Sequence, residues 1–170
     1  MRTIDIDSLM ALGIRAAALL KARNQTVAVG ETSSGGLISA SLLSVPGASA
    51  YYVGGAITYS GPSIEGLAGI SLAKMQADGI RSSSEQYAQL LANAVRSRHG
   101  NVTWGVSETG AAGPQGNVYG DPPGHTCMGV AGPVSLTRTL RTGSADRITN
   151  MQMFAEATLM LFIEALQAVD

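Results

Sequence analysis

The sequence predicts an α/β fold, namely a three-layer α/β/α domain around a central, mostly parallel or mixed sheet of about five strands. Short apolar segments of strand length alternate with segments of helical periodicity along the chain. Glycine and proline pairs separate these segments and mark turns. A length of 170 residues suffices for one buried core, so we expect residues 1–170 to form a single domain.

The N-terminal elements set the pattern. Asp7 or Ser8 is expected to cap a helix that runs to about Arg23, because leucine and alanine residues repeat on one helical face there. Thr26–Glu31 then predicts a short buried strand. A turn rich in hydroxyl groups and glycine, Thr32–Gly36, follows this strand and leads directly into a second helix.

The remaining elements follow the same alternation. Serines before a helical segment predict N-caps, and Gly-Pro pairs predict strand ends and a hairpin. In chain order, we expect a helix from Leu37 to before Pro46, a strand over Val53–Tyr59, short helices over Pro62–Ala68 and Ser71–Ala77, a helix over Glu85–Arg98, strands over Val102–Ser107, Thr126–Val130 and Leu136–Arg141, and a helix capped by Ser144 or Asp146 that ends near Gln167.

The surface carries few charges. Charged residues make up 14% of the chain, whereas about a quarter is typical of globular domains. Either the chain self-associates and hides part of its surface, or small residues coat it. We favour a homo-oligomer.

Composition also argues against several classes of function. The net charge is −1 and the basic residues are scattered, so we expect no binding to nucleic acid. No apolar segment is long enough to cross a membrane, and the N-terminus does not resemble a secretory signal. A lone cysteine, Cys127, permits no internal disulfide, and no metal-ligand spacing is present. We therefore expect a cytoplasmic protein without a metal or another cofactor.

The turn after the first strand is the first candidate site. Ligands of open α/β sheets bind at the carboxyl ends of strands. A helix that starts there directs free N–H groups toward anions such as phosphate. Glycines in the turn allow close approach, and its hydroxyl groups can bind a ligand or act as a nucleophile. These residues are Thr32, Ser33, Ser34, Gly35 and Gly36. The alternative is an ordinary helix cap, which such residues form very often.

Three other positions also follow or precede predicted strands. The loop Glu108–Pro114 contains glycines that suit a phosphate or a sugar, but it is also typical of a flexible surface loop. Tyr59 can orient a substrate or move a proton, or can simply be a half-buried strand residue. His125 is a candidate base, and the alternative is a solvated loop histidine. The chain has neither a P-loop nor a properly placed dinucleotide-binding glycine motif.

Several segments, taken in order, resemble motifs of the CinA C-terminal domain family, the nicotinamide-nucleotide amidases. The family patterns are AESCTGG-L, GG-x-x-x-YSN-x-x-K, TGxAGP, KPxGxV and GDR-x-x-x-R. The matching segments here are ETSSGGL from Glu31, GGAITYS from Gly54, TGAAGP from Thr109, PPGHTCMGV from Pro122 and ADRITNM from Ala145. Because the spacing agrees from the first helix to the last, the resemblance covers nearly the whole chain.

The resemblance implies hydrolysis of the amide of nicotinamide mononucleotide to nicotinic acid mononucleotide and ammonia. The family nucleophile is a serine whose position holds Thr32 here, with Ser33 as a neighbouring hydroxyl and Tyr59 as an assisting group. We expect the substrate, a nucleotide or another phosphorylated small molecule, to be bound by further residues of the motifs. These are Glu31, Ser34, Gly35, Gly36, Gly55, Thr109, Gly110, Gly113, His125 and Arg147.

The sequence departs from the family pattern where the family runs its reaction. Thr32 replaces the serine, Ile64 stands at the lysine position, and Met151 stands at the second arginine position. A hydroxyl without a base is a poor nucleophile at neutral pH. Three hypotheses follow: an amidase with a rewired site that uses Thr32 or Ser33 with His125 as base, an inactive protein that binds a nucleotide, or a different hydrolytic reaction in the same pocket.

Overall fold

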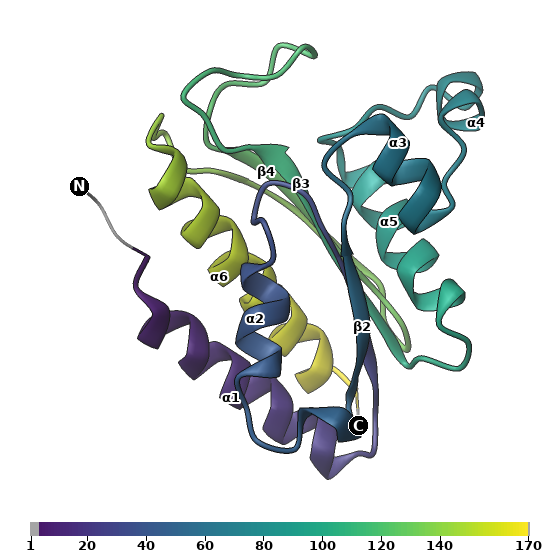
Figure 1. The fold of residues 1–170 in the computed structure, drawn as a ribbon, viewed down its shortest axis with the longest axis vertical. Coiled ribbons are helices and arrows are strands. Elements are labelled where there is room, and N and C mark those ends of the chain that lie inside the picture. The colour runs from purple at the N-terminus through teal and green to yellow at the C-terminus, as the bar shows by residue number, and fades with distance from the viewer. Residues whose placement is uncertain (1–3, 170) are drawn as a thin grey trace.

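The computed structural model describes residues 4–169 and contains a twisted five-stranded sheet (Figure 1). The strand order across the sheet is β2-β1-β3-β4-β5. The strands are β1 (Val27–Glu31), β2 (Tyr52–Ile57), β3 (Trp104–Ala111), β4 (His125–Ala131) and β5 (Leu136–Arg141). Strands β2, β1 and β3 are parallel, and β4 and β5 continue the sheet in antiparallel fashion. The predicted mixed sheet and the predicted β4–β5 hairpin are therefore confirmed.

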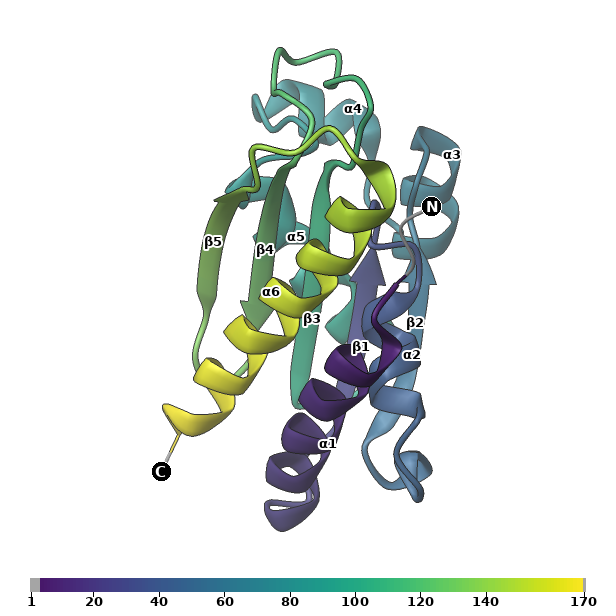
Figure 2. The ribbon, with the colours of Figure 1, turned by 90° about the vertical axis from the view of Figure 1, so that its left-hand side faces the viewer.

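Helices cover both faces of this sheet, which confirms the three-layer arrangement (Figure 2). The helices are α1 (Ile6–Ala22), α2 (Leu37–Leu43), α3 (Gly61–Ser63), α4 (Leu72–Ala77), α5 (Glu85–Arg98) and α6 (Arg147–Gln167), with short turns η1 (Ala48–Ala50) and η2 (Ile64–Ala68). Helices α1, α2 and α6 pack together on one face, whereas α5 covers β1, β3 and β4 from the other.

Two apolar cores result from the alternation of side chains along the strands. Val27 and Val29 of β1 belong to the core under α1 and α6, and Ala28 between them belongs to the core under α5. The larger core contains the edge-to-face pair of Trp104 and Phe162, whose ring centroids are 5.9 Å apart. No helix within residues 4–169 is long and apolar enough to cross a membrane.

Several boundaries differ from the prediction; β2, for example, ends at Ile57 and not at Tyr59. The cap of α1 is Asp5, whose side chain accepts from the backbone N–H of Ser8, and not Asp7 or Ser8. Strand β3 continues to Ala111, so Thr109 and Gly110 are strand residues and not part of a loop. Pairing with β4 extends the strand, because the antiparallel register continues to the pair Ala111 and His125.

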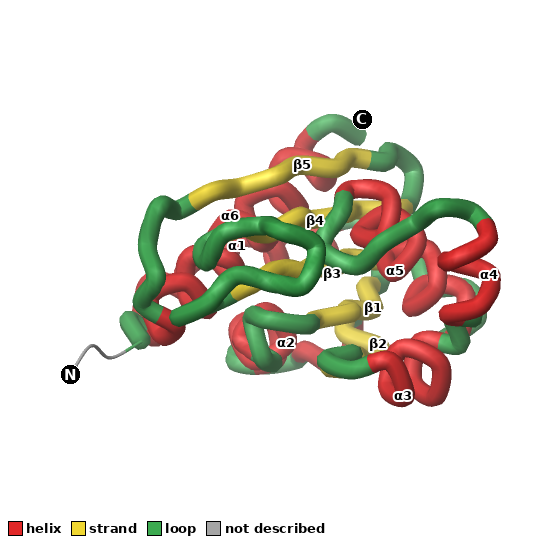
Figure 3. Tube along the Cα trace, turned by 90° about the horizontal axis from the view of Figure 1, so that it is seen from above, coloured by secondary structure: helices red, strands yellow, loops and turns green. Residues whose placement is uncertain are grey.

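The carboxyl ends of three parallel strands meet at one edge of the sheet. Glu31, the last residue of β1, pairs with Ile57 at the end of β2, and β3 runs alongside β1. The segments that follow these strands therefore lie together, and the start of α6 joins them through contacts of Arg147 with Gly113 and Tyr59. Figure 3 views the molecule from this end, with the connecting loops in green.

Candidate functional site

Glu31 organises the turn after β1 from inside. Its side chain is buried, and Oε1 accepts from the N–H of Ser39 at 2.8 Å and from the Ser39 hydroxyl at 2.6 Å. Oε2 accepts from the Ser34 hydroxyl at 2.8 Å and from the N–H groups of Gly36 and Ile38 at 2.9 and 3.1 Å. The helix N–H groups that we expected to bind a phosphate are thus already occupied. Glu31 and Ser34 hold the turn and do not line a cavity.

A second buried carboxylate, Glu108 of β3, lies beneath the same turn. Its Oε1 accepts from the Ser33 hydroxyl at 2.5 Å and from the Thr126 hydroxyl at 2.9 Å. Its Oε2 accepts from the N–H groups of Thr32 and Ser34 at 3.2 and 2.8 Å. The sequence placed Glu108 at the start of the candidate loop Glu108–Pro114 but gave it no role of its own. The available signal was a single charged residue directly after a predicted strand, and such a residue is rarely buried without partners.

Two adjoining cavities open at this edge of the sheet, and both are lined by Tyr59 and Gly110. The first, of about 480 Å³, is called the Thr32 cavity, and its other lining residues include Thr32, Thr58, Ile64, Leu72, Ser83, Tyr87, Thr109 and Tyr119. The second, of about 310 Å³, is called the Arg147 cavity, and it is lined by Ser33, Arg147 and the segment from Ala111 to Asn117.

The Thr32 cavity contains hydroxyl groups but no base beside Thr32. Within residues 4–169, the hydrogen bond of the Thr32 hydroxyl goes to the carbonyl oxygen of Thr58, at 3.4 Å. Ile64, at the family's lysine position, contributes an apolar wall. The Thr32 hydroxyl can therefore contact a ligand, and none of its described partners is a base.

The Arg147 cavity has the character of an anion site. The guanidinium donates through Nη1 to the carbonyl of Gly113 at 2.9 Å and through Nη2 to the Tyr59 hydroxyl at 3.3 Å. These contacts hold it at the mouth, and its other N–H groups remain available to a ligand. Gly113 has φ +107, and a Cβ there would lie 2.6 Å from the carbonyl oxygen of Ala145, so only glycine fits this bend beside α6.

His125 is not placed to act as a base on the turn. The imidazole is buried, and its Nε2 lies 3.0 Å from the carbonyl of Ser83, 3.7 Å from Asp121 and 3.6 Å from Cys127. Neither Thr32 nor Ser33 is among the partners described for it. His125 begins β4 and pairs with Ala111 of β3, and its ring faces Ser83, so this geometry does not support its predicted role as a base for Thr32 or Ser33.

The structure brings together most of the predicted site residues. Those that line one of the two cavities are Thr32, Ser33, Tyr59, Thr109, Gly110, Gly113 and Arg147. Gly35 and Gly36 adopt positive φ values of 66° and 98°, which the turn requires. Gly55 lines neither cavity: a Cβ there would lie 2.6 Å from the Tyr52 hydroxyl, so this glycine serves packing in the sheet.

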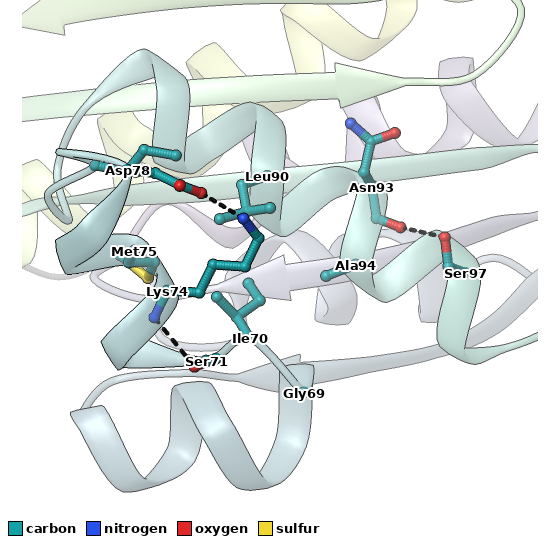
Figure 4. Close-up of a pocket in the computed structure, with 11 residues that line it drawn as sticks. Gly69, Ile70, Ser71, Lys74, Met75, Asp78, Leu90, Asn93, Ala94 and Ser97 are labelled. Atoms are coloured by element: carbon teal, nitrogen blue, oxygen red, sulfur yellow. Dashed lines mark hydrogen bonds and ion pairs between the residues drawn. The ribbon is translucent and has the colours of Figure 1, made fainter.

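A further hollow of about 390 Å³ lies away from these residues, between α4 and α5 (Figure 4). Its walls include Ile70, Met75 and Leu90, and the polar groups at its rim already have partners. Lys74 forms an ion pair with Asp78 at 2.8 Å, so this lysine does not replace the one that the family carries at Ile64. In the described part of the chain, no three His, Cys, Asp or Glu side chains gather as a metal site.

Comparison with known proteins identifies the fold and the relatives of this chain. A family model described as the CinA C-terminal domain matches residues 11–166. A CinA-like protein of Desulforapulum autotrophicum is 37% identical over 143 residues, which are 83% of this chain and 33% of that protein. A CinA-like protein of Chloroherpeton thalassium is 37% identical over 155 residues, 88% of this chain and 36% of that protein. The chain thus spans about a third of the length of these curated relatives.

Solved structures share the same architecture. The competence/damage inducible protein CihA of Agrobacterium tumefaciens superposes with a TM-score of 0.85 at 24% identity, covering 98% of this chain and 99% of that one. The competence damage-inducible protein A of Klebsiella pneumoniae gives a TM-score of 0.86 at 20% identity, covering 95% and 99%. At these identities, the likeness extends to the fold alone.

Proposed function

The chain belongs to the CinA C-terminal domain family, and from that premise we propose that it binds a phosphorylated pyridine nucleotide without hydrolysing its amide. The observation that supports this proposal most strongly is the pair of adjoining cavities, which differ in chemistry but share Tyr59 and Gly110. A pyridine mononucleotide has a similar division into a flat aromatic ring and an anionic phosphate.

Each end of such a ligand has a matching cavity. The Thr32 cavity offers walls from Ile64, Leu72 and Tyr119 to a planar ring. The Arg147 cavity offers a guanidinium that suits a phosphate, because its planar N–H groups pair with two oxygens at once. Tyr59 lies between the two and contacts Arg147 directly.

The absence of turnover follows from the surroundings of the hydroxyl groups. Thr32, at the nucleophile position, hydrogen-bonds a backbone carbonyl and has no base. Four N–H groups of the turn and the start of α2, those of Thr32, Ser34, Gly36 and Ile38, are bound to Glu31 and Glu108 and are not free to stabilise an oxyanion. An anionic intermediate there would also lie close to these carboxylates, which disfavours it.

The test combines binding and turnover. The protein is incubated with nicotinamide mononucleotide, and both the thermal shift and the release of ammonia are recorded. We expect a rise in Tm that grows with ligand concentration, and no ammonia above the protein-free control. No rise in Tm at millimolar ligand would contradict the assigned ligand.

Amide hydrolysis is the second candidate function, and one observation favours it. The Ser33 hydroxyl and Glu108 Oε1 lie 2.5 Å apart, and Ser33 lines the Arg147 cavity. In this alternative, Ser33 Oγ attacks the amide carbon while its proton passes to Glu108. Glu108 then gives that proton to the amide nitrogen, which leaves as ammonia, and water cleaves the resulting ester to the acid and free Ser33.

Two variants separate the candidates. If ammonia is released, Ser33→Ala abolishes it and Thr32→Ala does not, because Ser33 contacts Glu108 through its hydroxyl, whereas Thr32 contacts Glu108 through its backbone N–H. Loss of turnover in Thr32→Ala with full activity in Ser33→Ala would instead assign the family's own nucleophile position. Absence of turnover in wild type, together with ligand-dependent stabilisation, supports binding alone.

A further inference from the structure

One buried polar group that borders the Thr32 cavity lacks a hydrogen-bond partner. Tyr87 of α5 is 1% exposed and lines this cavity. Among the side chains described in residues 4–169, its hydroxyl is one of two buried polar atoms without a partner, the other being His125 Nδ1. Buried hydroxyls in folded proteins are nearly always paired, so an unpaired one beside a cavity points to a ligand.

The hydroxyl of Tyr87 is suited to donate. Burial raises the pKa of Tyr87 to about 12, and the nearby Thr58 hydroxyl opposes this rise. Thr58 itself donates to the carbonyl of Glu31, at 3.4 Å, and forms no hydrogen bond of ordinary geometry with Tyr87. The phenol therefore keeps its proton at neutral pH and can donate a hydrogen bond, for which residues 4–169 supply no acceptor.

The walls of the cavity define the kind of group that would bring this acceptor. Ile64 and Leu72 are apolar, and Tyr119 adds an aromatic face. Such a slot fits a flat ring, and a carbonyl substituent on the ring can accept from the buried phenol. A ring without that substituent would bury the hydroxyl still further and leave it unpaired.

We propose that Tyr87 is a specificity-determining residue whose hydroxyl donates to the carbonyl oxygen of a carboxamide borne by the ligand's ring. This inference rests on the proposed function, because it names the group by which the Thr32 cavity recognises a pyridine nucleotide. Discrimination arises because a ligand that lacks the carbonyl leaves a buried donor unsatisfied, and this costs affinity.

The test compares Tyr87→Phe with a matched control, Tyr51→Phe. Both tyrosines are 1% exposed, but the Tyr51 hydroxyl donates to the carbonyl of Leu42 and lines neither cavity of the candidate site. Isothermal titration measures affinity for nicotinamide mononucleotide and for the analogue in which hydrogen replaces the carboxamide. Thermal unfolding of the ligand-free proteins provides the second readout.

We expect wild type and Tyr51→Phe to prefer the carboxamide compound at least about tenfold, and Tyr87→Phe to lose this preference. Ligand-free Tyr87→Phe should keep or raise its Tm, because it removes an unpaired group, whereas Tyr51→Phe should lower it. Full preference in Tyr87→Phe, or a fall in its Tm like that of Tyr51→Phe, would overturn the inference. Wild type that binds both compounds equally also overturns it, and wild type that binds neither overturns the proposed function as well.

Discussion

Two buried carboxylates decide what the turn after β1 can do. Glu31 and Glu108 accept from backbone N–H groups that a helix N-terminus would otherwise offer to a phosphate or an oxyanion. Positive charge for a ligand therefore comes from a side chain, the guanidinium of Arg147. With these carboxylates beside it, the turn gives little stabilisation to a developing negative charge.

Replacement of Arg147 tests the anion site. Arg147→Gln should weaken binding of nicotinamide mononucleotide by at least about tenfold, because a charge-assisted contact with the phosphate is lost. Binding of the unphosphorylated riboside should change little. Isothermal titration of wild type and Arg147→Gln with each compound measures the change in affinity for the nucleotide and for the riboside. Arg138→Gln is the matched control, since Arg138 pairs with Glu164 on the surface, at 3.0 Å. Equal loss for both compounds would place the phosphate elsewhere.

The residues of the site differ in how far the sequence could reveal them. Thr32, Tyr59 and Arg147 were predicted because they stand within recognisable motifs at strand or helix ends. Glu108 and Tyr87 were not, because whether a strand acid or a helix tyrosine faces a cavity depends on packing between distant segments. The direction of the His125 ring was not predictable for the same reason, because it follows from the register of β4 with β3.

At the scale of elements, α2 depends on Glu31 more than on its own sequence. The helix has seven residues, which is too short for stability in isolation, and its N-cap, Gly36, makes no side-chain cap. Instead, the carboxylate of Glu31, which ends the preceding strand, accepts hydrogen bonds from the N–H groups at the start of this helix. The strand, turn and helix therefore form one cooperative unit.

Glu31→Ala should lower the free energy of unfolding by roughly 3 kcal/mol or more, because several buried donors lose their acceptor together. Urea denaturation followed by circular dichroism measures the change. Glu65→Ala is the control, because its exposed carboxylate accepts one bond, from the N–H of Leu72. A loss for Glu31→Ala no larger than the control's would show that the carboxylate does not hold the turn.

A second link between elements is sensitive to pH. Arg81, before α5, contacts Asp121 in the loop before β4 through two hydrogen bonds, of 2.6 and 3.1 Å. Burial alone would raise the pKa of Asp121, but the hydrogen bonds from Arg81 and Asn117 hold it below its ordinary value of 3.8. The carboxylate therefore stabilises the fold above that value, and this contribution disappears as pH falls through the lower folded-state pKa.

Arg81→Gln should accordingly cost about 1 kcal/mol of unfolding free energy at pH 7, and the difference from wild type should shrink as the pH falls below 3.8. Denaturation curves at several pH values measure both effects. Lys74→Gln serves as the control, because the exposed Lys74–Asp78 pair contributes little. A difference that stays constant down to acid pH would rule out the Asp121 carboxylate as its source.

At the scale of the whole molecule, the alternation of strands and helices predicted the α/β class, five strands and three layers. The strand order was not predictable, because it depends on which strand edges pair across long stretches of chain. The end of β3 was placed too early for a similar reason: Thr109 and Gly110 resemble loop residues, yet pairing with Cys127 and Thr126 keeps them in the sheet.

Self-association remains a prediction at this scale. The low charge content of the chain favours it. In addition, Val53 and Ile57 of the edge strand β2 are 45% and 47% exposed. An open edge of this kind is a template for pairing with another copy. We expect a dimer or larger assembly in sedimentation velocity, shifted toward monomer by Val53→Lys. A wild-type protein that sediments as a monomer at all concentrations would contradict this prediction.

The central claim is that the site binds a pyridine mononucleotide and leaves its amide intact. Saturation-transfer NMR of nicotinamide mononucleotide with wild-type protein, recorded over hours in one sample, measures both the binding of the ligand and the integrity of its amide. The account predicts transfer from the protein to the ring protons and an unchanged ligand spectrum. Steady appearance of the signals of nicotinic acid mononucleotide would contradict it and assign the amidase reaction to this chain.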